Sequence, residues 1–327
     1  MARRLLVMIA TMALLLGAAK VARADSLKIG TLAPADSPWG QVFKVWARNV
    51  DQRSNSALSL DWQWGGTAGD ENTMVASMKS NQLDGAAITA VGLGLMYQDV
   101  LVFQLPGAFS SWDQLSHARD AAKPALEAGF EASGFHILGW GDVGAAKIMS
   151  TKNYPVKVPN DLKGKNLSYI SGDQIGPVFL QKIGGISPTP VTVPEIYGKL
   201  TTGAIDVINA PPLAAQQLQW AGSVTNINTY TTGYGIGALV IAKSRFDSLP
   251  ADVQTVLSDT GGESARRLTN RIRAIDSAAF AQMKNNKTAY EPTDAEKALW
   301  NSVFQQTRAA LKGNPFSASI YATAGIN

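Results

Sequence analysis

A glycine pattern is the first feature of this chain that could do chemistry. Gly139, Gly141 and Gly144 follow an expected strand at 135–140 with the spacing G-x-G-x-x-G. In dinucleotide-binding proteins this spacing lets the backbone approach a pyrophosphate, and a helix then begins at the third glycine. Residues 145–150 are instead typical of a second strand. We therefore do not expect a nucleotide site here.

Side chains that could serve as nucleophiles, bases or metal ligands are few. The chain has no cysteine and only two histidines. The lack of cysteine excludes thiol nucleophiles, disulfides and thiolate metal sites. His117 is expected on the solvent side of a helix and His136 in a strand, and pairs such as Asp70-Glu71 are too common to indicate a hydrolase. The spacings of a P-loop, a nucleophile elbow or a helical zinc site do not occur. The sequence predicts no catalytic centre, no metal site and no cofactor.

The N-terminus has the pattern of an export signal. Arg3 and Arg4 precede an apolar run, 5–19, and Ala22-Arg23-Ala24 forms a small-x-small cleavage site. We expect residues 1–24 to be a secretory signal peptide that is removed on export. The chain has 29 Lys plus Arg and 25 Asp plus Glu. Residues 1–24 hold four of the basic residues and no acid, so the exported chain would be neutral, and nucleic acid is not an expected partner.

The remaining residues alternate between strand and helix patterns, and their number suits two domains. A turn at 37–40 leads into a helix, and further helices are expected at 71–81, 176–183 and 194–202. The expected strands are 27–32, 58–64, 85–89, 135–140, 145–150, 165–170 and 204–208. Such alternation favours an α/β fold with mostly parallel sheets.

The longest predicted element begins after Pro250. An apolar stripe at helical spacing continues to about Lys287, which predicts a helix of about 35 residues and about 50 Å. Such a helix is longer than one small domain and would brace two. Its basic residues, Arg266, Arg267, Arg271 and Arg273, are expected on the solvent face.

Four stretches of the sequence together resemble the solute-binding subunits of TRAP (tripartite ATP-independent periplasmic) transporters of the DctP type. Each stretch alone could be an ordinary strand, turn and helix, but their order and spacing match together over nearly the whole exported chain. The stretches are 28–40, 78–89 followed by 102–106, 159–165, and 194–206 extending to Ala210-Pro211-Pro212.

The resemblance implies a two-domain α/β periplasmic binding protein of class II-like architecture. An interdomain cleft, hinge strands and a long domain-spanning helix belong to that architecture. The implied division is 25–148 plus about 234–290 for the first domain, and 149–233 plus about 291–327 for the second. A closing motion would enclose one ligand, which must bind the closed state better than the open one.

The chain departs from the resembled family where relatives bind carboxylates. Relatives use an Arg in the strand after the Asp-Leu-Lys-Gly turn, and this chain has Ser168 there. Ala146 occupies a second Arg position, and Ala210 a position where relatives often have Asn. Lys147, next to Ala146, would point to the opposite face of a strand. We therefore predict a neutral, largely apolar cleft with a neutral or lipophilic ligand. In lacking the Arg, the chain resembles a branch of the family that is associated with apolar ligands and with a TPR-repeat protein as partner.

The resemblance also suggests which side chains would contact the ligand. The residues at cleft positions are Trp39, Trp140, Ser168, Tyr169 and Asn209, with Thr67, Thr89 and Tyr234 as weaker candidates. Trp39 can also be interpreted as a turn residue and Asn209 as a capping residue, and for Tyr169 a place in the core is the simpler interpretation.

Two other functional classes stay open at this level. One is an ordinary organic-acid receptor whose cation comes from elsewhere, although Arg48, Arg53 and Arg119 lie on predicted surface helices. The other is a secreted hydrolase, a remote alternative for which no nucleophile and base are found. Expected partners are a small molecule and TRAP membrane subunits, and the short tail after Pro315 favours a monomer.

Overall fold

The computed structural model describes residues 25–151 and 154–326. The predicted signal peptide, 1–24, lies outside these residues. No helix in the described part of the chain combines the length and the apolar character needed to cross a membrane.

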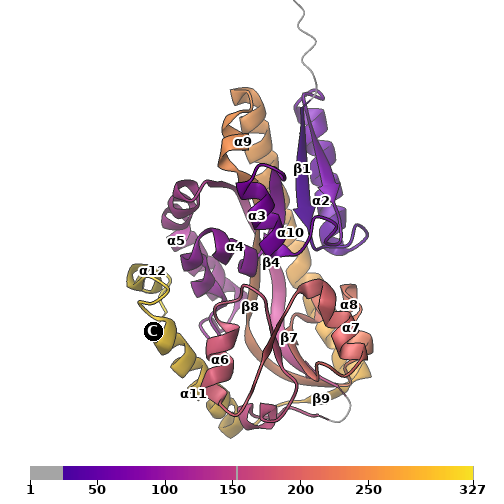
Figure 1. Cartoon of the computed structure of the whole chain (residues 1–327), viewed down its shortest axis with the longest axis vertical. Helices are drawn as coiled ribbons and strands as arrows, with labels where there is room; N and C mark the ends of the chain where they lie inside the picture. Colours follow the sequence, from indigo (N-terminus) through magenta and orange to yellow (C-terminus); the bar gives the residue numbers. More distant parts are fainter. Residues whose placement is uncertain (1–24, 152–153, 327) are drawn as a thin grey trace, which may run out of the picture.

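One seven-stranded sheet runs through the molecule (Figure 1). Its strand order is β2 (Leu58–Gln63), β1 (Asp25–Thr31), β3 (Gly85–Thr89), β8 (Asn226–Ala242), β4 (Phe135–Ser150) and β7 (Val207–Ala210), with β9 (Thr288–Tyr290) beside β8. A small parallel pair, β5 (Ser168–Ile170) and β6 (Thr189–Val191), lies apart. The sheet is mixed rather than mostly parallel. The pairs β1–β2 and β1–β3 are parallel, but β8 is antiparallel to β3 and β4, because β4 and β8 run in opposite directions between the two lobes.

The strands β4 and β8 connect the two lobes of the molecule. They have 16 and 17 residues and pair antiparallel from Phe135 with Ala242 to Ser150 with Asn226, with several register shifts. Successive residues of β8 alternate between two cores in the first lobe: Val240 packs with α4 (Ala90–Met96) and α5 (Trp112–Ala132), and Ile241 packs with α2 (Pro38–Arg53). The two long strands are therefore the hinge strands that the resemblance implies.

The long helix predicted from the sequence is confirmed. Helix α10 extends over Ala251–Asn286, 36 residues, and packs on β4, on α2 and on α8 (Pro212–Gln217). Its buried stripe includes Leu257, Leu268 and Met283, which belong to the cores of both lobes. The helix thus braces the two lobes along one side.

Shorter elements complete the two lobes. Helix α6 has the predicted bounds, Gly176–Ile183, and α2 begins at Pro38 because Ser37 accepts a hydrogen bond from the Gly40 N–H. The others are α3 (Glu71–Lys79), α7 (Ile196–Thr201), α9 (Lys243–Asp247), and the 3₁₀ turns η1 (Gln98–Gln104), η2 (Pro159–Leu162), η3 (Val193–Glu195) and η4 (Trp220–Gly222).

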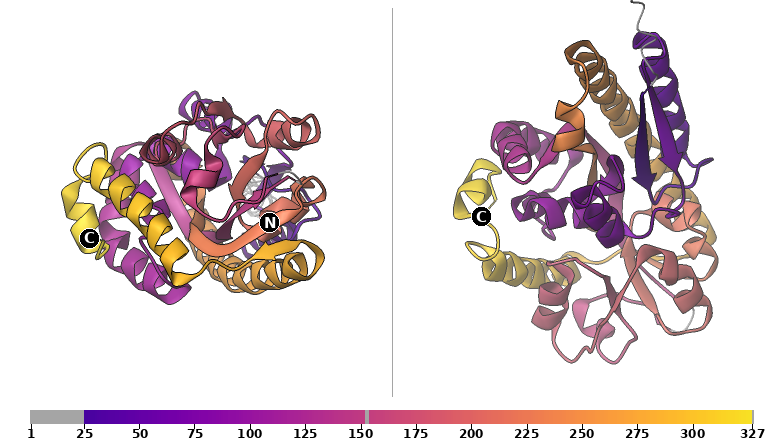
Figure 2. Two further views of the ribbon diagram at one scale, coloured as in Figure 1. Left: turned by 90° about the horizontal axis from the view of Figure 1, so that it is seen from below. Right: turned by 45° about the horizontal axis from the view of Figure 1, so that its top comes forward.

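The C-terminal segment contacts both lobes (Figure 2). Helix α11 (Asp294–Leu311) packs against α6, whereas α12 (Ala318–Thr323) packs against α5 and η1. The expected domain boundaries at 148/149 and 233/234 fall inside β4 and β8. They stay a prediction, because the hinge strands belong to both lobes.

Candidate functional site

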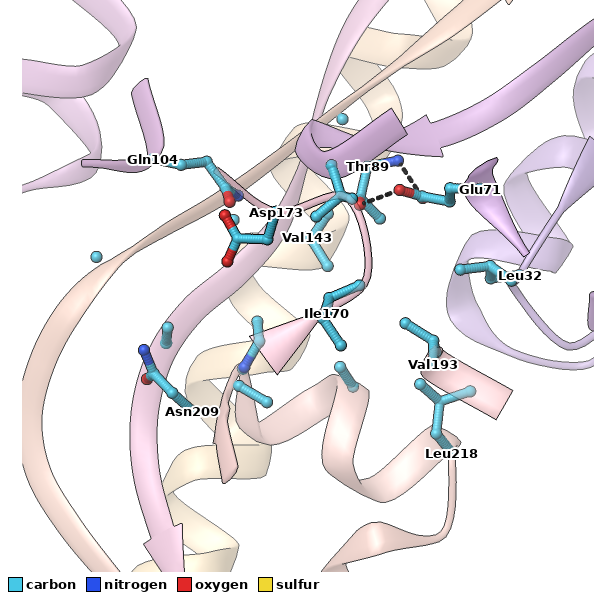
Figure 3. Close-up of a pocket in the computed structure, with 18 of the residues that line it drawn as sticks. Leu32, Glu71, Thr89, Gln104, Val143, Ile170, Asp173, Val193, Asn209 and Leu218 are labelled. Atoms are coloured by element: carbon cyan, nitrogen blue, oxygen red, sulfur yellow. Dashed lines mark hydrogen bonds between the residues drawn. The ribbon is translucent and has the colours of Figure 1, made fainter. Parts of the chain in front are cut away.

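A cavity of about 380 Å³ lies between the two lobes (Figure 3). Its walls come from β1, α2, β3 and η1 of the first lobe, from β5, α6, β7 and α8 of the second, and from both hinge strands. Most of the lining is aliphatic or aromatic, including Phe43, Val143, Ile170, Phe179 and Leu218. The volume and the apolar lining are typical of a small-molecule site.

The charged residues that line this cavity are all acidic. They are Glu71, Asp142 and Asp173, and no lysine, arginine or histidine of the described chain lines it. A carboxylate ligand would therefore meet like charges and find no cationic partner on the wall. How each acid is held decides what the cavity can bind.

Glu71 is bound by the first turn of α4. Its Oε1 accepts the Thr89 N–H at 2.7 Å, and its Oε2 accepts the Thr89 hydroxyl and the Gly92 N–H, each at 2.8 Å. Burial raises the pKa of this carboxyl, and the three hydrogen bonds oppose that rise. Glu71 therefore caps a helix, and both of its carboxylate oxygens accept hydrogen bonds from the protein.

Asp142 is held by two arginines, Arg119 and Arg273, both of which the sequence places on the surface. Its Oδ1 lies 2.8 Å from Arg119 Nη1, and its Oδ2 lies 2.6 Å from Arg273 Nε. Arg119 was expected on a surface helix but is buried in α5, and Arg273 was expected on the solvent face of α10. Both turn inward because a carboxylate buried in the hinge strand needs cationic partners. Neither arginine lines the cavity.

Asp173 precedes α6 in the second lobe. Its Oδ1 accepts the Ile175 N–H at 2.8 Å, and its Oδ2 accepts the Gly176 N–H at 3.1 Å. Burial raises the pKa of this carboxyl. An Asp shortly before Gly176-Pro177 is a recognisable helix-start pattern, but nothing in the sequence marks Asp173 as a cavity residue.

Lys147 lies outside the cavity, as the strand alternation predicts. Ala146 and Ile148 line the cavity, whereas the Lys147 ammonium donates to Thr229 O at 2.8 Å and to Thr231 Oγ1 at 2.5 Å. Desolvation lowers the pKa of Lys147 to about 8, with Asp276 opposing the shift. Lys147 is the cation nearest in sequence to a family Arg position. Its ammonium therefore holds the two hinge strands together and does not face the cavity.

The structure brings six of the eight predicted site residues to the cavity. These are Trp39, Thr89, Ser168, Tyr169, Asn209 and Tyr234. Asn209 Oδ1 accepts a hydrogen bond from Thr232 Oγ1 at 2.8 Å, and the amide nitrogen of Asn209 takes no part in that bond (Figure 3). Ligand contact by any of the eight stays a prediction.

Thr67 and Trp140 do not line the cavity. Thr67 is exposed in the loop after β2. The Trp140 ring packs edge-on against Phe130, and its Nε1 donates to Glu127 at 3.2 Å. Trp140 therefore faces α5, because it is on the side of β4 that the first-lobe core covers.

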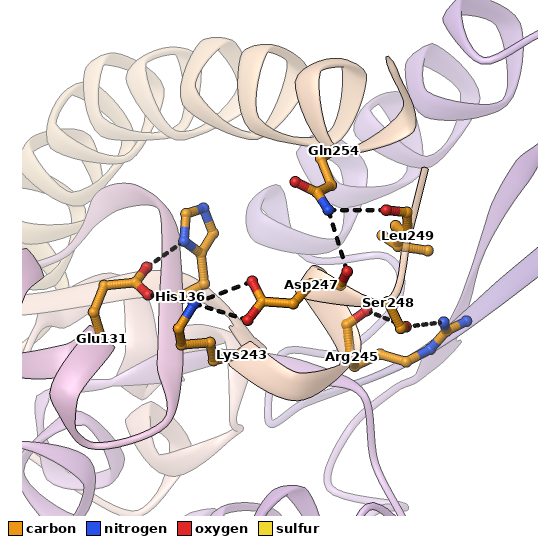
Figure 4. A network of polar contacts seen from close by, with 8 residues as sticks. All are labelled: Glu131, His136, Lys243, Arg245, Asp247, Ser248, Leu249 and Gln254. Atoms are coloured by element: carbon orange, nitrogen blue, oxygen red, sulfur yellow. Dashed lines mark hydrogen bonds and ion pairs between the residues drawn. The ribbon is translucent and has the colours of Figure 1, made fainter. Parts of the chain in front are cut away.

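The two histidines lie away from the cavity, at positions expected from the sequence. His117 is exposed on α5, and His136 of β4 stacks on Phe246 and contacts Glu131, which also pairs with Lys243 (Figure 4). Among the described residues, no group of three or more His, Asp or Glu could hold a metal ion.

The comparisons with known proteins agree with this architecture. The family model "Bacterial extracellular solute-binding protein, family 7" (DctP) matches residues 29–312. The "C4-dicarboxylate-binding periplasmic protein DctP" of Rhodobacter capsulatus is 25% identical over 283 residues, 85% of this chain and 83% of that protein.

Solved structures share the fold. A TRAP periplasmic solute-binding protein of Sulfurospirillum deleyianum with bound succinate has a TM-score of 0.85 at 16% identity, covering 93% of this chain and 99% of that one. One of Roseobacter denitrificans with bound β-D-glucuronate has a TM-score of 0.83 at 17% identity, covering 93% and 100%. The family model matches most of the chain, which argues against the hydrolase alternative. The chain belongs to the bacterial extracellular solute-binding proteins of family 7, which are receptors and not enzymes.

Proposed function

We propose that this protein is the periplasmic receptor of a TRAP-type transporter and that its ligand is neutral or largely apolar rather than a carboxylate. The receptor would capture the ligand in the interdomain cavity, close about β4 and β8, and deliver it to TRAP membrane subunits. The family match and the relatives' names support the receptor role. The observation that carries the ligand class is a cavity wall with three acids and no base.

Electrostatics explains why that wall disfavours an organic acid. A carboxylate that loses its hydration on closure, without a partner, costs at least several kcal/mol. An Arg fork would offset that cost with two parallel charge-assisted hydrogen bonds, which neither Ser168 nor Ala146 can supply. About three kcal/mol corresponds to more than a hundredfold in affinity. A tightly held dicarboxylate therefore does not suit this cavity.

The organic-acid alternative rests on the relatives, whose solved structures contain succinate and glucuronate. For this chain it would need a relocated cation. Arg119 and Arg273 are the candidates, because both form ion pairs with Asp142, which lines the cavity. Turning either toward a ligand would weaken the pairing of a fully buried carboxylate, so the geometry favours the neutral ligand.

Three further parts of the proposal concern partners and location. We infer export by cleavage after residue 24, a monomeric receptor, and a periplasmic TPR-repeat protein as an additional partner. The pattern of the first 24 residues supports the inferred export, and the missing arginines support the inferred TPR-repeat partner.

Direct titration tests the ligand class. The exported protein is titrated calorimetrically, at low salt, with succinate and β-D-glucuronate, the acids found in two solved relatives. We expect no saturable binding with a dissociation constant below about 100 μM for either acid. Tight binding that weakens as salt is added would support the organic-acid alternative and overturn the neutral-ligand proposal.

A further inference from the structure

Asp173 differs from the other two acids of the cavity in the partners that hold it. Glu71 already accepts three hydrogen bonds, and Asp142 is paired with two guanidinium groups. The two oxygens of Asp173 accept one backbone N–H each. A carboxylate oxygen can accept two hydrogen bonds, so each oxygen of Asp173 retains one free acceptor position.

No cation compensates the charge of Asp173. Among the described residues, no lysine, arginine or histidine lies within 4.0 Å of its carboxylate. The residue is partly exposed on the side of the cavity, and the surrounding protein desolvates it enough to raise its pKa. A desolvated carboxylate gains most from a partner that is positively charged and donates hydrogen bonds.

The position of Asp173 also suits a ligand that closure encloses. Asp173 belongs to the second lobe, and Gln104, at the end of η1, belongs to the first. Figure 3 shows the end of the Gln104 side chain facing the Asp173 carboxylate across the cavity. A group bound between them would be held by both lobes, so it would favour the closed state, as a transported ligand must.

We infer that Asp173 is the specificity-determining residue of the cavity and that it binds a protonated amine at the polar end of an otherwise apolar ligand. The Gln104 amide oxygen is available as a second acceptor for the same ammonium. The apolar walls, including Ile170, Phe179 and Leu218, would receive the hydrocarbon part. This inference rests on the proposed function and selects, among the largely apolar ligands, an amine with an apolar body over a neutral molecule.

Three probes with the same hydrocarbon chain test the inference: hexylamine, hexan-1-ol and hexanoate, titrated calorimetrically at neutral pH into the whole exported protein. A charge-assisted hydrogen bond exceeds a neutral one enough to make the amine about tenfold tighter than the alcohol. Hexanoate should bind more weakly than either. An amine that binds no better than the alcohol, or that does not bind measurably, would overturn the inference.

Asp173→Asn should remove the preference for the amine. Asn is a good helix-capping residue, so the start of α6 keeps an acceptor for a backbone N–H. Asp294→Asn is the matched control, because it makes the same chemical change on a side chain that is 99% exposed. The control should keep the tenfold preference. A preference that survives in Asp173→Asn would also overturn the inference.

Gln104→Lys provides a second variant that leaves the cap of α6 untouched. It places an ammonium of the protein opposite Asp173, which would occupy the site of the ligand's amine. The variant should lose hexylamine preference and retain hexan-1-ol binding, and retained preference would argue against Asp173. Tightest binding of hexanoate to the wild type would contradict the proposed function itself, whereas equal binding of amine and alcohol would overturn this inference alone.

Discussion

Ala146 and Lys147 are adjacent residues of β4, yet only Ala146 lines the interdomain cavity. The Lys147 ammonium lies on the other side of the strand, where it donates to Thr229 O and Thr231 Oγ1 of β8. A cation at position 146 would line the cavity, whereas the cation at position 147 binds groups of the neighbouring strand. As a result, no basic side chain in the part of the chain that the structure describes lines the cavity, although solved structures similar to this chain contain bound organic acids.

Returning an arginine to the cavity should create affinity for a dicarboxylate. Ser168 lines the cavity at the position where the resembled family has Arg. Ser168→Arg should bind succinate about tenfold to a hundredfold more tightly than the wild type, because the guanidinium can pair with the carboxylate in a fork. Calorimetric titration measures the change. Ser302→Arg, on the exposed surface of α11, is the control and should leave succinate binding unchanged.

The paired arginines around Asp142 should contribute strongly to stability. Arg119 is 8% and Asp142 0% exposed in the side chain, so removing one charge leaves a buried one undercompensated. Arg119→Met should lower the free energy of unfolding by about 3 kcal/mol, as measured by urea denaturation. Arg53→Met breaks exposed pairs with Asp259 and Glu263 and should cost less than about 1 kcal/mol. Equal losses in the two variants would show that the Asp142 pairs are not special.

The hinge lysine predicts a pH dependence of stability. Burial lowers the pKa of Lys147 from 10.5 to about 8 in the folded protein, so between these values the unfolded chain binds more protons than the folded one. The free energy of unfolding should therefore rise with pH from about 8 to 10.5, by at most about 3 kcal/mol from this residue. Urea denaturation of the wild type and of Lys147→Met across this range isolates the effect, because other groups titrate in both. A constant difference between them would contradict the prediction.

Gly144 should be the least replaceable glycine of the hinge. Its φ is +142°, and a Cβ there would lie 2.5 Å from the Pro211 Cβ and 2.7 Å from Asp276 Oδ1. Asp276 also binds the N–H groups of Ala145 and Leu213, so it cannot move aside cheaply. Gly144→Ala should cost about 2 kcal/mol or more of unfolding free energy.

Gly198→Ala is the matched control for the hinge glycine. It lies in α7, and its Cβ would meet no atom within 4 Å. Alanine is the better helix former, so this variant should be neutral or more stable by up to about 1 kcal/mol. Thermal denaturation of the two variants compares them. A Gly144→Ala protein as stable as the Gly198→Ala protein would show that the hinge can relax around the extra methyl group.

Regular patterns were enough to predict the elements that frame the cavity. The apolar stripe after Pro250 predicted α10 almost to its ends, and alternation along β4 predicted that Lys147 faces away from Ala146. Both follow from fixed geometry, the helical repeat in one case and the strand repeat in the other. The position of Ser168 on the cavity wall came from the resemblance and not from any pattern.

Tertiary partners decided the features that the patterns missed. Arg119 lies four residues after the buried Leu115, so helical spacing places it on the buried stripe of α5, but its charge suggested the surface. Only the fold brings Asp142 to that stripe. Trp140 matches a cleft position of the resembled family, but β4 turns its ring toward Phe130. Asp173 was missed because a helix-start acid looks the same whether or not a cavity lies beside it.

Native mass spectrometry of protein exported to the periplasm identifies the class of ligand that the cavity holds. Spectra are recorded before and after extraction with an organic solvent. We expect a co-purified neutral or basic small molecule, largely apolar, whose mass disappears on extraction. A bound organic acid would contradict it, because the described cavity wall offers such a ligand three carboxylates and no cation.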